Sequence, residues 1–286
     1  MSTRTIVVTV TEDLAELVTD RMWQWGVQAV SETAGGNGVV EIATSVGNDV
    51  DAIDRALATL DPSWAVVVRD VEDAIAQVPA EFLSPTWYAP GMVSVPAALL
   101  PFEPDDPATT VTVIDPGSAF GLGDHPTTRT SMALLAELLR SRDSVDSVDR
   151  ASGPHDRLLD VGCGTGALAV LGAQLGVPTI RAIDIADAAV AATRRNMELN
   201  GVDGSIVVDT TPVADVTGTF DIVMANILAP VLVSMAGDLR RLVRPGGSLV
   251  ISGILADRHD HVLDALQPLA PVRSLEHDGW VSIILR

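Results

Sequence analysis

The sequence predicts an α/β protein in which a doubly wound parallel sheet is joined to a smaller amino-terminal α+β domain. One observation is residues 158–167, where an apolar run ending in Asp160 passes through three glycines directly into a second apolar run. This pattern is typical of a strand, a tight loop and a helix. The other observations are that predicted strands and helices alternate from there to the carboxyl end, and that residues 1–70 have the order β-α-β-β-α-β.

Residues 1–70 are predicted to form a ferredoxin-like domain. Their β-branched content predicts strands over 4–10, 27–33, 39–44 and 64–70, and the patterns between them predict helices over 11–25 and 49–60. The order is that of a split βαβ arrangement. Because this module occurs with many functions, it fits a partner-binding role and a packing role equally well.

Residues 71–110 are predicted to form a connector between the two domains. Seven prolines interrupt any long element in this stretch, so we expect at most one short helix. Trp87 and Tyr88 are expected to pack the connector onto a domain. The main domain is therefore predicted to span residues 111–286.

The main domain opens with a glycine-rich loop. We expect a strand over 111–114, the loop over 115–128, a helix over 129–140 and a polar surface insertion over 141–156. Glycine-rich loops beside a nucleotide site often act as covers. On pattern alone, a turn hydrogen bond explains His125, and helix capping after Pro126 explains Thr127 and Thr128.

Three glycines of the stretch 158–167 are candidate ligand-binding residues: Gly162, Gly164 and Gly166. Glycine takes backbone angles closed to other residues, and the start of the following helix offers unpaired N–H groups. The next apolar run carries Asp184 at its end, where a carboxylate can accept hydrogen bonds from both hydroxyls of a ribose. This spacing predicts a nucleotide-like ligand.

The remaining elements complete the predicted sheet. We expect strands over 205–209, 220–225 and 248–252, helices over 187–199, 230–243 and 257–266, a turn at 244–247, and a strand pair around 277–279. In a doubly wound sheet the ligand lies at the carboxyl ends of the strands. Gly162, Asp184 and Asn226 are therefore predicted to converge there.

Composition excludes several classes of function. The formal net charge of −20 disfavours general nucleic-acid binding and favours a basic protein as macromolecular partner. Every basic residue except histidine is arginine, since the chain contains no lysine. Cys163 is expected to be a small filler in the glycine loop, and no Cys/His cluster has metal-ligand spacing. No apolar run is long enough to span a bilayer and the opening residues lack a signal peptide, so we expect a cytoplasmic protein.

The glycine motif alone leaves two chemistries open. Gly162-x-Gly164-x-x-Ala167 followed by Asp184 also fits a dinucleotide fingerprint, which predicts a nicotinamide-dependent oxidoreductase. The long region before the glycine-rich strand, the third glycine at Gly166 and the Pro-Gly-Gly turn before a hairpin instead resemble the class I (Rossmann-like) methyltransferases that use S-adenosylmethionine. That resemblance implies that the glycine motif lines the amino-acid part of the cofactor and that Asp184 binds its ribose.

Three further stretches sharpen the resemblance: 115–128, 224–229 (Met-Ala-Asn-Ile-Leu-Ala) and 252–255 (Ser-Gly-Ile-Leu). They are similar to the ribosomal protein L11 methyltransferase family, PrmA, from about residue 111 to the end, although Leu122 and Asp124 depart from the small or hydroxyl residues common at their positions. Residues 1–70 resemble the substrate-recognition domain of that family. Carried over by position, the resemblance implies that Thr128, Gly162, Asp184 and Asn226 contact the cofactor.

The resemblance implies a protein N-methyltransferase that acts on lysine side chains or an α-amino group, with the ribosomal stalk-base protein as first substrate. Methyl transfer needs a neutral amine lined up behind the sulfonium methyl, so positioning supplies much of the rate. Asn226 is the candidate catalytic residue, because its side-chain or main-chain oxygen can hold the amine. Phe120, with Leu122, is expected to cover the methyl group and exclude water. No residue is predicted to be an obligate base.

Other functions remain open at this point. The nearest alternative is a related methyltransferase that acts on another protein through a changed recognition domain. An inactive binding module and the nicotinamide-dependent oxidoreductase fit the sequence less well. A nucleic-acid amino-methyltransferase would prefer Asn-Pro-Pro-aromatic at the fourth strand. Here Asn226 is followed by Ile-Leu-Ala, and the negative charge argues against it as well.

Overall fold

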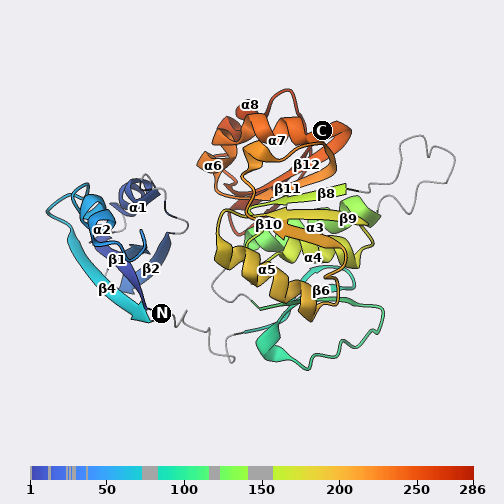
Figure 1. Ribbon diagram of the computed structural model, residues 1–286, viewed down its shortest axis with the longest axis horizontal. Coiled ribbons are helices and arrows are strands. Elements are labelled where there is room, and N and C mark those ends of the chain that lie inside the picture. Colours follow the sequence, from blue (N-terminus) through green and yellow to red (C-terminus); the bar gives the residue numbers. More distant parts are fainter. Residues whose placement is uncertain are drawn as a thin grey trace. The chain divides into compact units, whose positions relative to one another are not determined.

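The computed structural model describes residues 2–11, 14–23, 25, 27, 30–36, 38–72, 83–115, 123–140 and 157–286. The chain divides into two compact units, Met1–Gln77 and Val78–Arg286 (Figure 1). No helix in these ranges is long and apolar enough to cross a membrane.

The amino-terminal unit is a four-stranded antiparallel sheet with two helices. Its elements are β1 (Ser2–Thr11), α1 (Ala15–Trp23), β2 (Ser31–Gly36), β3 (Val39–Thr44), α2 (Val50–Leu57) and β4 (Ala65–Glu72). The sheet order β2-β3-β1-β4 inserts β3 between β1 and β2, and β1 between β3 and β4. Three alternate residues of β1, Ile6, Val8 and Val10, pack in one apolar cluster with Val18 and Met22 of α1 and Ile53 of α2.

The second unit contains a seven-stranded sheet in the order β10-β9-β8-β11-β12-β14-β13. Its strands are β8 (Arg157–Val161), β9 (Thr179–Ile183), β10 (Ile206–Asp209), β11 (Phe220–Asn226), β12 (Val243–Leu255), β13 (Pro271–His277) and β14 (Trp280–Leu285). The first five in spatial order are parallel, and β14 is antiparallel to both β12 and β13. The predicted doubly wound sheet is confirmed.

Helices cover both faces of this sheet (Figure 1). They are α3 (Pro126–Arg140), α4 (Ala167–Gln174), α5 (Asp187–Leu199), α6 (Ala229–Ser234), α7 (Ala236–Leu242) and α8 (Asp260–Leu266). Leu158 packs with α3, α4 and α5 residues, whereas the next residue, Leu159, packs with α6, α7 and α8 residues. Burial on both faces explains why the strands read as continuous apolar runs.

A three-stranded sheet occupies part of the stretch that proline content predicts to be an irregular connector. It consists of β5 (Thr86–Ala89), β6 (Met92–Pro96) and β7 (Thr110–Ile114), in the order β5-β6-β7, with the short 3-10 helix η3 (Ala97–Leu99) after β6. The prolines are compatible with it because Pro90 lies in the turn between β5 and β6, and Pro96 is the last residue of β6. Tyr88 is buried as predicted, but Trp87 is 48% exposed and is not a packing anchor.

Two further elements differ from the prediction. The helix expected over 230–243 is two helices, α6 and α7, which meet at Met235. The turn expected at 244–247 lies within β12, where the pairing with β11 shifts register between Phe220 and Ile222 and Gly246 has φ +76°. Residues 244–247 have no register partner on β11, and the pairing resumes at Ser248, so the Pro-Gly-Gly sequence forms a bulge within β12 and does not end it.

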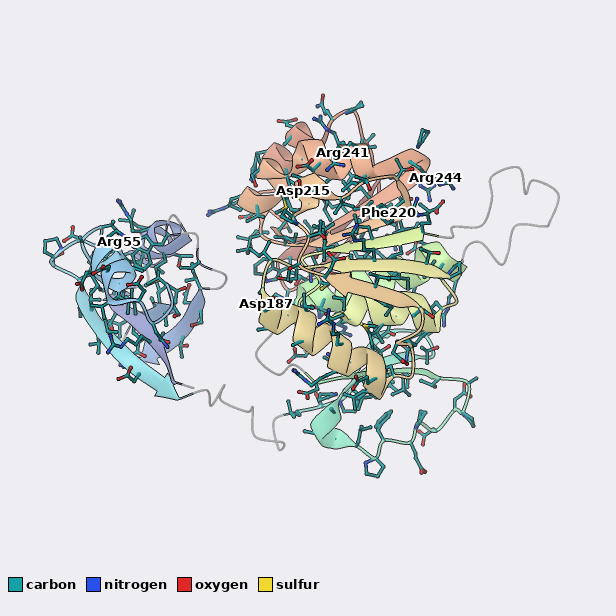
Figure 2. All side chains as sticks on the ribbon, viewed as in Figure 1. Arg55, Asp187, Asp215, Phe220, Arg241 and Arg244 are labelled. Carbon is teal, nitrogen blue, oxygen red and sulfur yellow. The ribbon has the colours of Figure 1, made fainter. Side chains whose placement is uncertain are left out.

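Arginine side chains hold the first residues of β11 in place. Arg157 lies 4.8 Å from the ring centroid of Phe220, and Arg244 forms an ion pair with Asp221 (Figure 2). Arg241 of α7 donates to three carbonyls at and just after the 3-10 helix η4 (Val213–Asp215), at 2.6–2.9 Å. Arg157 and Arg244 thus contact the end of β11 that is opposite to Asn226, while Arg241 holds the segment before it.

Candidate active site

The glycine loop, residues 162–166, connects β8 to α4 with a backbone that only glycine accepts readily. Gly162, Gly164 and Gly166 have φ angles of +68°, +55° and +77°. A Cβ atom on Gly162 would lie 2.9 Å from Cδ1 of Ile227, and one on Gly166 would lie 2.6 Å from Cγ2 of Thr193. The backbone conformation therefore favours glycine at all three positions, and the branched side chain of Thr193 also leaves no space for a Cβ atom at Gly166.

Asp184 follows β9 and bridges two backbone segments. One carboxylate oxygen accepts the N–H of Gly164 at 3.0 Å, and the other accepts the N–H of Ala186 at 3.0 Å, just before α5. A carboxylate offers about four acceptor positions, so two remain for other donors. The next side chain, Ile185, is 71% exposed and was not predicted as a site residue.

Asn226 and Thr128 are brought together although they lie 98 residues apart. Asn226 is the last residue of β11, and its Nδ2 donates to Oγ1 of Thr128 in the first turn of α3 at 3.5 Å. Ser252 is the register partner of Asn226 on β12, and its hydroxyl donates to the carbonyl of Thr127 at 3.2 Å. The first turn of α3 is thus attached to the ends of β11 and β12.

A chain of buried hydroxyls extends this attachment. Oγ of Ser252 lies 2.6 Å from Oγ of Ser282 on β14, which lies 2.6 Å from Oγ1 of Thr130 on α3. All three side chains are at least 94% buried. Sequence reasoning missed this network because serine and threonine at these positions continue the strand and helix patterns without marking a contact.

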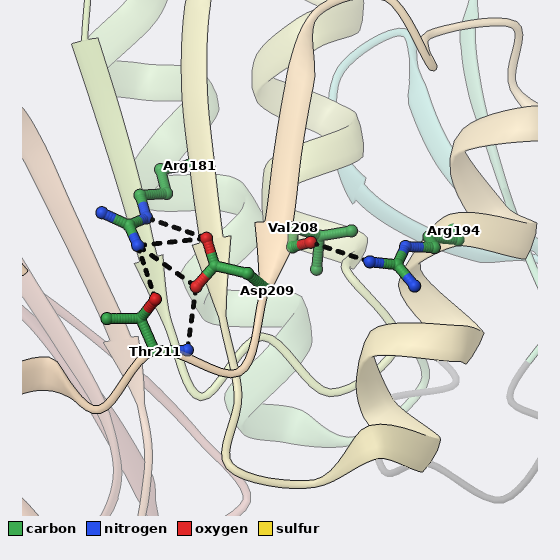
Figure 3. Close-up of polar contacts among 5 residues, drawn as sticks. All are labelled: Arg181, Arg194, Val208, Asp209 and Thr211. Atoms are coloured by element: carbon green, nitrogen blue, oxygen red, sulfur yellow. Dashed lines mark hydrogen bonds and ion pairs between the residues drawn. The ribbon is translucent and has the colours of Figure 1, made fainter.

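The end of β10, next to β9 in the sheet, has a polar cluster of its own. Asp209 ends β10, and its carboxylate accepts two hydrogen bonds from the Arg181 guanidinium at 3.2 Å and the N–H of Thr211 at 2.8 Å (Figure 3). Although burial opposes the shift, the hydrogen bonds from Thr211 and Arg181 lower the pKa of Asp209. The carbonyl of Asp209 also accepts the N–H of Asp184 at 3.2 Å, so this cluster supports the Asp184 segment.

His125 and Cys163 have packing and turn roles. Nδ1 of His125 lies 2.8 Å from Oγ1 of Thr127, as expected of a turn hydrogen bond, and burial lowers the pKa of His125 against the effect of Asp124. Burial also raises the pKa of the Cys163 thiol, whose sulfur lies 3.4 Å from Oγ1 of Thr193. A buried protonated thiol is a filler rather than a nucleophile.

Asp160 is a buried carboxyl on β8, only 1% exposed. One of its oxygens accepts the N–H of Ala169 in α4 at 3.2 Å. Burial raises the pKa of Asp160 to about 7, against the effect of this hydrogen bond and with a contribution from the charge of Asp184. The carboxyl therefore titrates near neutral pH in the folded chain.

The variant Asp160→Asn is expected to remove a loss of stability at high pH. The pKa of this carboxyl is near 7 when folded and 3.8 in its ordinary state, so the folded chain binds more protons between these values. The free energy of unfolding then falls as pH rises through this window, by about 4 kcal/mol for this group. The melting temperature of the variant relative to the unchanged chain should therefore increase from about pH 5 to about pH 8. A difference in melting temperature between the two proteins that stays constant from about pH 5 to about pH 8 would contradict the prediction.

Two predicted residues lie outside the described part of the chain. These are Phe120 and Leu122, the expected cover of the methyl group. Within the described ranges, no group of three or more His, Cys, Asp and Glu side chains is arranged to hold a metal ion.

Comparison with known proteins identifies the family. The family model described as ribosomal protein L11 methyltransferase (PrmA) matches residues 79–286. This chain belongs to the PrmA family. A ribosomal protein L11 methyltransferase of Geotalea daltonii is 34% identical over 77% of this chain and 71% of its own length.

Other PrmA relatives match over different extents. A ribosomal protein L11 methyltransferase of Geobacter metallireducens is 44% identical, over 57% of this chain and 49% of its own length, so the match spans about half of that relative. The crystal structure of a ribosomal protein L11 methylase from Lactobacillus delbrueckii subsp. bulgaricus superposes with a TM-score of 0.59 at 28% identity, covering 71% of this chain and 97% of that chain. The class I methyltransferase fold is thereby confirmed.

Proposed function

We propose that this chain is a protein N-methyltransferase that transfers the methyl group of S-adenosylmethionine to lysine side chains or an α-amino group of a ribosomal protein, L11 first. The observation that carries the proposal is the meeting of the glycine loop, Asp184 and the pair Asn226–Thr128 at the carboxyl ends of parallel strands, in a chain of the PrmA family. Ligands of doubly wound sheets bind at this edge.

The residues present fit S-adenosylmethionine. Gly162, Gly164 and Gly166 would line its amino-acid part, and Cβ atoms added at Gly162 and Gly166 would come within 3 Å of neighbouring side chains. Asp184 has two acceptor positions left for the ribose hydroxyls, and Ile185 offers an exposed apolar surface for the base. The other proposed cofactor contacts are Thr128, Asn226 and, by resemblance, Phe120.

The bound cofactor supplies an electrophilic methyl group on a sulfonium. Asn226 is proposed to hold the substrate amine through its side-chain or main-chain oxygen, since it stands at the strand end beside Thr128. Holding a neutral amine in line with the methyl group accounts for much of the rate of such a transfer. The net charge of −20 favours the approach of a basic substrate protein.

The strand order favours this function over the nicotinamide-dependent oxidoreductase. Dinucleotide-binding sheets continue as parallel strands in the order 3-2-1-4-5-6. In this chain an antiparallel strand, β14, is inserted between β12 and β13. The family membership supports the same choice.

The amino-terminal unit is proposed to recognise the protein substrate. The family model begins at residue 79, so this role rests on the resemblance of residues 1–70 to the recognition domain of the family. We place the reaction in the cytoplasm, because ribosomal proteins are made and assembled there.

Methyl-labelled S-adenosylmethionine, incubated with the purified chain and ribosomal proteins, is expected to label lysine or the amino terminus of L11. Because the chain contains no lysine, any labelled lysine in a digest analysed by mass spectrometry comes from the substrate. The variant Asn226→Ala should incorporate about tenfold less label at saturating cofactor, since the amine loses a positioning group. Label on a different protein would support the methyl-transfer reaction but show that L11 is not the substrate. Cofactor binding without label on any protein would contradict the proposed transferase activity.

A further inference from the structure

One edge of β7 is paired with side-chain amides instead of another strand. In the order β5-β6-β7, the strand β7 has β6 on one side only. On its other edge, Val111, Val113 and Asp115 each bond to a side-chain amide. We name these three amides the amide ladder: Gln174 of α4, Asn196 of α5, and Asn200 directly after α5. The ladder satisfies backbone groups that an edge strand would otherwise leave unpaired.

Asn196 and Asn200 make matching contacts with the strand. Asn200 accepts the N–H of Val113 at 2.8 Å and donates to its carbonyl at 2.7 Å. Asn196 accepts the N–H of Asp115 at 2.8 Å and donates to its carbonyl at 3.0 Å. Gln174 completes the ladder by donating to the carbonyl of Val111 at 2.9 Å. Asn196 in the last turn of α5 and Asn200 directly after the helix thus make the same pair of contacts with this segment.

Asn196 alone of these two asparagines also reaches the glycine loop. Its Nδ2 donates to the carbonyl of Thr165 at 2.8 Å, whereas Nδ2 of Asn200 makes its second bond within α5, to the carbonyl of Asn196 at 2.7 Å. Asn196 is completely buried. Its single amide therefore connects the end of β7 to the loop that lines the proposed cofactor site.

A second residue of α5, besides Asn196, also holds the glycine loop. Oγ1 of Thr193, one turn before Asn196, donates to the carbonyl of Gly164 at 3.1 Å. On the other side of Gly164, its N–H donates to Asp184 at 3.0 Å. The carbonyls of two consecutive loop residues are consequently fixed by α5, and only the second of them is also tied to β7.

We propose that Asn196 is a positioning residue for the methyl donor, because it fixes the Thr165 carbonyl of the glycine loop against the end of β7. The inference rests on the proposed function in taking S-adenosylmethionine as the ligand. A loop held in its binding conformation before the ligand arrives loses less conformational entropy on binding. The expected effect of disrupting Asn196 is therefore weaker donor binding at unchanged kcat.

The matched pair Asn196→Asp and Asn200→Asp tests this in the full chain. In each variant the aspartate keeps an oxygen that accepts the backbone N–H of Val113 or Asp115. It loses the NH₂ group that donates to two carbonyls. Isothermal titration with S-adenosylmethionine, well below the melting temperatures, should give a dissociation constant about tenfold higher for Asn196→Asp and within about twofold of the unchanged chain for Asn200→Asp. The KM for the donor should rise in parallel, while kcat at saturating donor remains the same.

A milder variant tests the same loop where Asn196→Asp does not fold. Thr193→Val keeps the side-chain shape and removes only the hydroxyl, so the dissociation constant should rise about threefold. Equal weakening by both asparagine variants, or unchanged affinity of Asn196→Asp and Thr193→Val, would overturn the positioning role. Failure of the unchanged chain to bind S-adenosylmethionine would instead overturn the proposed function, and this inference with it.

Discussion

Asp184→Asn is expected to raise the dissociation constant for S-adenosylmethionine about 100-fold, because the two charge-assisted hydrogen bonds that we propose it accepts from ribose hydroxyls are worth about 1.5 kcal/mol each. The replaced oxygen also holds the N–H of either Gly164 or Ala186. An amide NH₂ facing one of these donors cannot accept a bond, so the loop and the start of α5 lose a shared attachment. Both effects act on the same binding step.

Isothermal titration calorimetry measures this loss, and Asp187→Asn is the matched control. Asp187 is exposed in the first turn of α5, three residues further along, and its removal makes the same change in net charge (Figure 2). We expect the control to bind the donor like the unchanged chain. Equal affinities of the two variants would show that charge alone, and not the contacts of Asp184, determines binding.

Gly253→Ala is expected to destabilise the chain by about 3 kcal/mol or more and to reduce methyl transfer at least about 100-fold. Gly253 has φ +84°, and a Cβ atom there would lie 2.5 Å from the carbonyl oxygen of Ile227. Ile227 follows Asn226 directly and donates its N–H to the carbonyl of Ser252 at 3.0 Å. Relief of the clash must move backbone, so it displaces the proposed catalytic residue.

Gly246→Ala is the control for backbone strain alone. Gly246 also lies in β12 with a positive φ, +76°, but nothing lies within 4 Å of an added Cβ atom. It should cost only about 1 kcal/mol of unfolding free energy in urea titrations. If both variants lose the same stability and activity, close packing of Gly253 against Ile227 has no part in forming the site.

Much of the candidate site is predictable because its residues follow local patterns. Glycines between a strand and a helix, and polar residues directly after apolar runs, indicate Gly162, Asp184 and Asn226 without knowledge of any long-range contact. Thr128 is different, because on pattern alone helix capping is the favoured explanation. Its contact with Asn226 depends on α3 lying against the end of β11.

The predictions failed where neighbouring elements override local signals. Composition predicts an irregular stretch where β5 and β6 form. Pro90 in the turn and Pro96 at the strand end do not interrupt their pairing. The pairing of β12 with β11 resumes at Ser248, after residues 244–247 that have no register partner on β11, so the strand does not end at the Pro-Gly-Gly sequence. Exposure separates Trp87 from Tyr88, which are equivalent in the sequence pattern.

The sequence by itself determined the alternation of strands and helices in the doubly wound sheet, since this depends on periodic apolar residues and glycine positions along the chain. Its motifs at 115–128, 224–229 and 252–255 indicated the family by resemblance. The tertiary structure alone decided the partners of Asn196, Ser252, Ser282 and Thr130. Those partners are up to 152 residues away, and polar side chains that satisfy buried groups carry no periodic signal. Their roles become visible only when helices and strands are packed together.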